Sequence, residues 1–168
     1  MGLTYKFRRA QRIIAGLPPA NRRRLEGIAA EVQAAEEDLL RRAAVPMAQC
    51  LGACRGLCCR NVDLDAIIAT DDFIYLLARA PHLEGPIASC LAAETPLFTA
   101  DCPFLADGVG PCTFPEGLRP EVCLTTFCGD TAHIRREIRR LKRAFWKLAW
   151  FVRLRRLPAP CRAWLGLA

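Results

Sequence analysis

The sequence has no long hydrophobic run and no apolar leader. Nowhere do about 18 apolar residues follow one another without a charge, the length that a membrane-spanning helix needs. The first nine residues, MGLTYKFRR, have neither the apolar stretch nor the cleavage site of a secretory signal, and Lys6 stands where a myristoylation signal has Ser or Thr. These absences predict a cytoplasmic protein, in a reducing compartment where cysteines stay as thiols.

Histidine is also scarce in the sequence, and so are loops rich in glycine. The two histidines, His82 and His133, stand near expected helix ends, so we expect surface or capping residues rather than metal ligands. We find no glycine-rich loop of the kind that binds nucleotides or S-adenosylmethionine. The sequence therefore does not decide whether the protein is an enzyme.

Cysteine, by contrast, is abundant, with ten in 168 residues. Thiolates that lie close together in a folded loop can share a soft metal ion or an iron–sulfur cluster. Cys58 and Cys59 are neighbours, and a disulfide between them would strain the peptide. The predicted ligands form a tight run and a spread set: Cys50, Cys54, Cys58, Cys59, and then Cys102, Cys112, Cys123, Cys128.

The spacing of the cysteines does not decide which metal they bind. Eight thiolates could form two tetrahedral zinc sites, or hold a 4Fe–4S cluster with four of them. The run from Cys50 to Cys59 continues without a partner hairpin, which favours cluster ligation over simple zinc knuckles, and disulfides or unliganded thiols are the weakest alternative. Cys90 and Cys161 stand among apolar residues and are expected to be plain buried cysteines.

Composition and charge indicate one small domain, residues 1–168, with its cysteine core at 50–128. The hydrophobic fraction of 52% is that of a globular protein. Residues 43–129 carry 4 basic and 10 acidic groups, a net of −6, whereas residues 130–168 carry 11 basic and 2 acidic, a net of +9. An acidic neighbourhood around thiolates favours a bound cation over free thiolates.

The fold is predicted to be mostly α-helical, with irregular cysteine-rich loops and at most a short β-hairpin. Apolar spacing predicts a helix over 21–44, capped by Asn21, whose Glu26, Glu31, Glu36, Glu37 and Asp38 form a solvated face. Alternation over 61–69 predicts a short strand. The remaining expected elements are a helix over 70–80 begun by Thr70, Asp71 and Asp72, a short helix over 87–93, a hairpin over 101–114, a helical turn opened by Arg119-Pro120, and a helix over 130–157.

The last segment, 129–168, is expected to form a basic helix. Its apolar residues Ile134, Ile138, Leu141, Phe145 and Leu148 recur every three or four positions, so one face should pack on the core and leave the basic side outside. Peripheral contact with an anionic membrane is the alternative, because Trp and Arg together suit a membrane interface. Nucleic acid is disfavoured because no reading motif accompanies the charge, and a protein partner of unknown identity stays open.

The order of the cysteine elements resembles the YkgJ-type cysteine-cluster family. The shared pattern is a CxxCxxCC-like run, here Cys50 to Cys59 with three-residue gaps, followed by three further elements: Cys102-Pro-Phe-Leu105, Cys112-Thr-Phe114 and Arg119-Pro-Glu-Val-Cys123. The resemblance covers residues 50–128 and implies chelation of zinc or iron. A related branch, the flagellin-lysine methylating proteins, joins a similar cysteine set to methyl transfer, which makes an iron–sulfur-dependent methyltransferase the alternative function.

Overall fold

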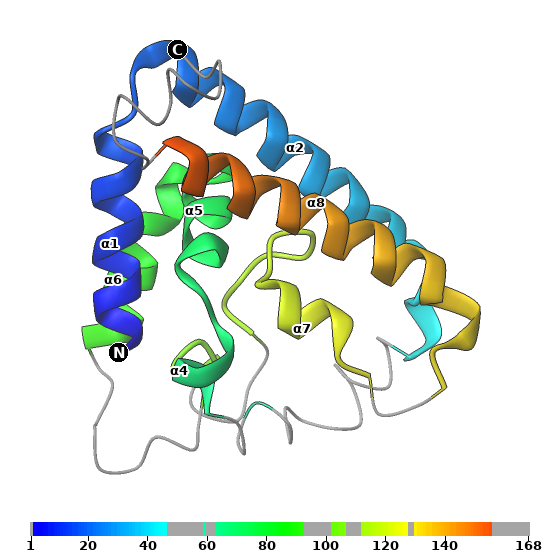
Figure 1. Ribbon diagram of the computed structural model, residues 1–168. Coiled ribbons are helices and arrows are strands. Elements are labelled where there is room, and N and C mark those ends of the chain that lie inside the picture. Colours follow the sequence, from blue (N-terminus) through cyan, green and yellow to red (C-terminus); the bar gives the residue numbers. More distant parts are fainter. Residues whose placement is uncertain are drawn as a thin grey trace.

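The computed structural model describes residues 2–46, 59, 63–92, 102–106, 112–127 and 130–155. In these ranges the protein is mostly α-helical, as the sequence predicts, and it contains no β-strand. The two longest helices, α2 (Pro19–Arg42) and α8 (Arg135–Arg155), run side by side, and the shorter helices lie on one side of this pair (Figure 1).

The packing of α8 against α2 and α5 is mainly apolar. Leu25, Val32 and Leu39 of α2 are fully buried, as are Leu141 and Leu148 of α8. Each such side chain contributes about 1.5–3 kcal/mol on burial. The exposed ion pairs Lys147–Glu31, 2.6 Å between Nζ and Oε2, and Arg140–Asp38 contribute about 0–1 kcal/mol each. The predicted apolar face of α8 is therefore confirmed as the packing face.

Helix α5 (Thr70–Arg79) lies at the centre of the fold and contacts α1, α2 and α8. Its Phe73 ring meets Phe7 of α1 (Leu3–Ala15) edge to face, with centroids 5.4 Å apart. On its other side, the Tyr75 ring meets Phe145 of α8 at 5.2 Å. Helix α6 (Glu84–Ala92) follows a short 3-10 turn, η1 (Pro81–Leu83), and also contacts α1.

The periodic apolar segments were predicted well. The expected helices over 21–44, 70–80, 87–93 and 130–157 appear as α2, α5, α6 and α8, the last preceded by the 3-10 turn η3 (Ala132–Ile134). The turn opened by Arg119-Pro120 appears as α7 (Glu121–Thr125), with Pro120 as its N-cap residue. Helix α1 was not expected, although Leu3, Phe7 and Ala10 form a buried helical stripe.

Three local predictions were wrong. The segment expected as a strand over 61–69 contains α4 (Leu64–Ile67), because the Asp63 carboxylate caps the helix by accepting from Asp65 N at 3.1 Å and Ala66 N at 3.3 Å. Asn21 is not the cap of α2, which begins at Pro19, since proline fits the first helical turn. Glu36 does not lie on a solvated face but is fully buried.

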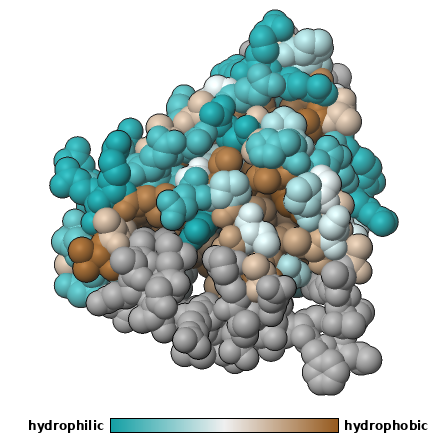
Figure 2. Space-filling view, turned by 180° about the vertical axis from the view of Figure 1, so that it is seen from behind, coloured by the Kyte–Doolittle hydropathy of each residue, from teal (hydrophilic) through white to brown (hydrophobic). Residues whose placement is uncertain are grey.

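The expected hairpin over 101–114 is present only as one isolated antiparallel bridge between Leu105 and Cys112, within the described parts of that segment. The Thr113 N–H donates to Phe104 O at 2.7 Å and joins the two arms. Its turn at Asp107-Gly108 lies outside the described residues. From behind, hydrophilic residues cover most of the upper part of the molecule, with hydrophobic ones showing between them lower down (Figure 2).

Candidate metal centre

Four of the eight predicted ligands lie in described segments, and hydrogen bonds bring three of these segments together. The Cys102 N–H donates to the Cys59 carbonyl at 2.7 Å, which joins residue 59 to the 102–106 arm. The Leu105–Cys112 bridge then joins that arm to the segment after residue 112. Cys50, Cys54, Cys58 and Cys128 lie outside the described residues.

An aromatic pair joins the two cysteine arms. The rings of Phe104 and Phe114 lie 4.6 Å apart and are almost fully buried. Each phenylalanine stands two residues after a cysteine, Cys102 and Cys112 respectively. Burial of these rings fixes the two arms against the helical core, so the cysteines stand on a supported surface rather than on free loops.

The fourth cysteine, Cys123, stands on α7, and the thiols influence one another. Burial, helped by the thiols of Cys112, Cys59 and Cys90, raises the pKa of Cys102 to about 12, although a hydrogen bond from Phe104 N–H lowers it. Burial also raises the pKa of Cys123, with added contributions from Cys112, Cys102 and Cys59. The residue Cys123 is exposed, although many protein atoms surround its thiol. Cys102 and Cys123 therefore respond to the same neighbouring thiols and stay protonated at neutral pH without a cation.

No group of three His, Cys, Asp or Glu side chains in the described ranges is close enough together to hold a metal ion. Half of the predicted ligand set lies outside those ranges. His82 and His133 are both exposed, in agreement with their expected surface positions.

Cys90 of α6 lies nearer to the other thiols than the sequence suggested. It is half-buried, and its charge raises the pKa of both Cys102 and Cys112. The sequence placed it on an apolar helix outside the cysteine pattern, so its spacing gave no signal of this proximity. Cys161, the other cysteine left outside the ligand set, is not in the described part of the chain.

Two buried carboxylates hold the segment that leads into α7. The Arg119 N–H donates to Glu36 Oε1 at 3.0 Å, and the Glu121 N–H donates to Asp72 Oδ1 at 2.9 Å. These two N–H groups flank Pro120, and Asp72 also accepts from Ala69 N at 2.8 Å. Glu36 comes from α2 and Asp72 from α5, so both helices fix the position of α7 and hence of Cys123.

Neither carboxylate was predicted from the sequence to hold α7. Glu36 stands four residues after the buried Val32, on the apolar stripe of α2, and this position was the signal that could have identified it. Asp72 was interpreted as helix N-terminal charge; it does cap α5, but it is buried and also binds α7. Burial raises the pKa of Glu36 to about 7 and that of Asp72 to about 6.

Arg119 links the carboxylate of Glu36 to the cysteines. Its side chain is 8% exposed, and its Nε has no hydrogen-bond partner among the residues that the structure describes. The guanidinium lowers the pKa of both Glu36 and Cys112. It therefore lies within electrostatic reach of both a buried carboxyl and a half-buried thiol. The Tyr75 hydroxyl completes this network by donating to Glu36 Oε2 at 2.6 Å.

In the described ranges, none of the helices combines the length and the apolar character that would let it cross a membrane. Comparisons of the chain with known proteins gave no significant match to a protein-family model, to a curated protein or to a solved structure.

Proposed function

We propose that this protein is a metal-binding module that holds an iron–sulfur cluster or zinc through cysteine thiolates. The observation that carries the proposal is that Cys59, Cys102, Cys112 and Cys123 come from three described segments that hydrogen bonds join, and that their thiols influence one another electrostatically. Ionising several neighbouring thiols is costly unless a cation compensates their charge, so this grouping favours a bound metal. The proposed ligands are the eight cysteines of the sequence pattern: Cys50, Cys54, Cys58, Cys59, Cys102, Cys112, Cys123 and Cys128.

The residues around the thiols fit such a centre. Thiolates are the preferred ligands of zinc and of iron–sulfur clusters. The buried Arg119 supplies a positive charge and an unused N–H donor near Cys112, and hydrogen bonds to sulfur stabilise clusters and tune them. The uninterrupted run from Cys50 to Cys59 favours iron–sulfur over zinc.

A bound cluster would supply one-electron chemistry, whereas zinc would contribute folding free energy alone. The chain's own part is to hold the thiols in place. Glu36 and Asp72 fix α7, and the Phe104–Phe114 pair fixes the two arms. The methyl-transfer alternative would need a substrate cavity beside the centre.

A surface hollow among the described residues gives that alternative no support. It lies along α1, and no cysteine contributes to it; its lining residues are Gly2, Thr4, Tyr5, Arg8, Gln11 and Arg12. The module is therefore the function that we propose, and methyl transfer rests on the sequence resemblance alone.

The proposal is tested by serine substitution of the described ligands. Cys102→Ser and Cys112→Ser should each reduce the metal retained after chelator treatment by tenfold or more, since a lost thiolate removes a direct bond to the metal. Cys161→Ser is the matched control and should leave metal content unchanged. Equal metal content in all three variants would show that these cysteines are not ligands.

A further inference from the structure

The outer face of α8 carries an exposed aromatic pair. Trp146 is 66% exposed and Trp150 is 49% exposed, and their rings stack with centroids 5.5 Å apart and planes 8° from parallel. These indoles lie outside the apolar face of α8, which is buried as the sequence predicts. Two large aromatic side chains kept together in water are unusual for a surface that has no binding role.

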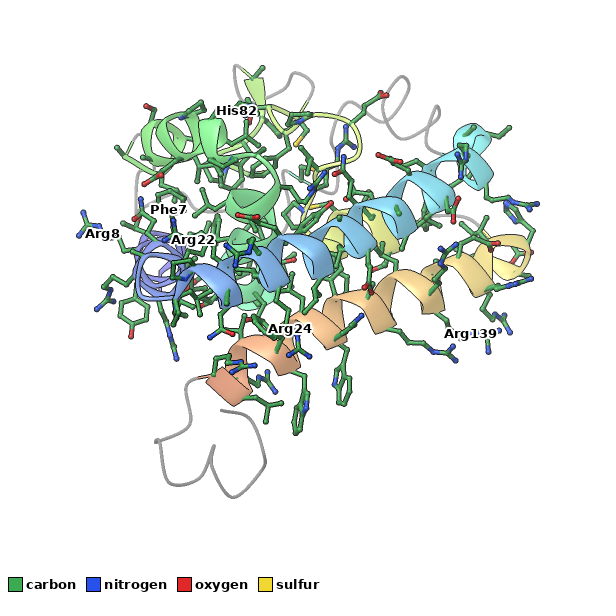
Figure 3. The ribbon with its side chains drawn as sticks, turned by 90° about the horizontal axis from the view of Figure 1, so that it is seen from above. Phe7, Arg8, Arg22, Arg24, His82 and Arg139 are labelled. Carbon is green, nitrogen blue, oxygen red and sulfur yellow. The ribbon has the colours of Figure 1, made fainter. Side chains whose placement is uncertain are left out.

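Arginines extend this pair into a continuous stripe along α8. The residues Arg135, Arg139, Arg143, Trp146, Trp150 and Arg153 follow one another at intervals of three or four, so they share one side of the helix. All six are exposed. We call these six residues the α8 stripe. Arg139 extends away from α2 and α8 in the view from above (Figure 3).

The charges of the α8 stripe form no ion pairs that stabilise the described part of the fold. Neighbouring basic residues of α8 form the ion pairs with the rest of the molecule: Arg140 with Asp38, Lys147 with Glu31, and Lys142 with Glu121 at 3.9 Å. Within the described ranges, the stripe arginines have no carboxylate partner. Four positive charges and two indoles are therefore presented together without compensation.

We infer that the α8 stripe binds the headgroup region of an anionic lipid bilayer. Guanidinium groups pair with lipid phosphate and carboxylate, and indole rings prefer the headgroup level of a membrane. The stripe follows one exposed side of a 21-residue helix, and such a side can lie along a planar partner. Single-stranded nucleic acid, the competing occupant, is bound by proteins that supply a basic groove with separate stacking platforms, and here the two indoles stack on each other. This inference is independent of the metal centre.

The test is co-sedimentation of the full chain with vesicles of phosphatidylcholine, with or without phosphatidylserine. Binding should require phosphatidylserine and should weaken as salt rises, because screening shortens the reach of the charges. Each basic residue near an anionic surface changes the binding constant by about fivefold, so Arg139→Glu with Arg143→Glu should weaken binding by at least about 25-fold. Trp146→Ala with Trp150→Ala should weaken binding in high salt more than in low salt, since it removes the apolar part.

The matched control is Arg23→Glu with Arg42→Glu, an equal charge change at two exposed positions of α2 that lie outside the stripe. The control should bind nearly as well as the unmodified protein, and circular dichroism should show that every variant is folded. The inference is overturned if phosphatidylserine vesicles fail to bind the protein at low salt, or if the control loses as much binding as the stripe variant. It is also overturned if the tryptophans prove necessary for single-stranded nucleic acid and not for vesicles.

Discussion

At the scale of single residues, Glu36 is the most unusual group in the described chain. It is a carboxyl with no solvent exposure, it accepts from the Tyr75 hydroxyl and the Arg119 N–H, and burial raises its pKa from 4.5 to about 7. A raised carboxyl pKa means that the folded protein binds the proton more tightly than the unfolded chain does. Its contribution to stability is therefore present in full below pH 4.5 and is lost as the pH rises through 7.

Glu36→Gln should remove this part of the pH dependence. A shift from 4.5 to about 7 corresponds to about 3 kcal/mol, at 1.36 kcal/mol per pH unit. Urea denaturation at pH 5 and at pH 8 should show a smaller loss of stability in the variant than in the unmodified protein. Glu26→Gln, at an exposed position of the same helix, should leave the loss unchanged. An identical pH dependence in all three proteins would contradict the assignment.

Arg119 is predicted to support the metal centre without being a ligand. Arg119→Met removes the buried charge beside Cys112 and should weaken metal retention by about 10–100-fold, the range found when groups next to metal ligands are removed. Arg119→Lys restores the charge but not the planar fork, so partial rescue is expected. Competition with a chelator measures both. Unchanged metal retention in Arg119→Met would show that Arg119 contributes to packing and not to metal binding.

At the scale of elements, the position of α7 depends on side chains from α2 and α5. Asp72→Asn leaves one oxygen to accept from the two N–H groups of Ala69 and Glu121, so one bond is lost and about 1–3 kcal/mol of stability with it. Because α7 carries Cys123, metal retention should fall in the same variant. Glu116→Gln, at an exposed position before α7, is the control for both measurements. Loss of stability with full metal retention would contradict the inference that the position of α7 affects metal binding.

Whether the sequence could predict an element depends on which interactions stabilise that element. α2, α5 and α8 are stabilised by periodic apolar residues, and this periodicity is visible in the sequence. In α4, a single cap at Asp63 overrides an alternating pattern over only a few residues, so the strand prediction was wrong. The candidate site is predicted from the sequence only as a set of cysteines, and it stays a prediction. The proximity of Cys90 and the burial of Glu36 depend on tertiary packing between helices far apart in the sequence.

At the scale of the whole molecule, two kinds of stabilisation occupy different regions. The α2–α8 pair and α1–α5 are held by many buried apolar side chains, whereas the 102–106 and 112–127 segments contribute few, among them the Phe104–Phe114 pair, and add a few hydrogen bonds and the proposed metal. Metal removal should therefore increase hydrogen exchange in 102–106 and 112–127 much more than in α2 and α8, because ligation contributes free energy only where it acts. A uniform increase in all helices would show that the metal stabilises the entire fold instead.

The most direct test of the metal centre is analysis of the protein purified without oxygen. We expect tightly bound iron with a matching amount of acid-labile sulfide, and a broad absorbance near 400 nm, roughly where iron–sulfur clusters absorb. Stoichiometric zinc without sulfide would retain the thiolate centre and correct its metal. Protein that carries neither metal after anaerobic purification, and binds neither on reconstitution, would contradict the central claim that these cysteines are ligands.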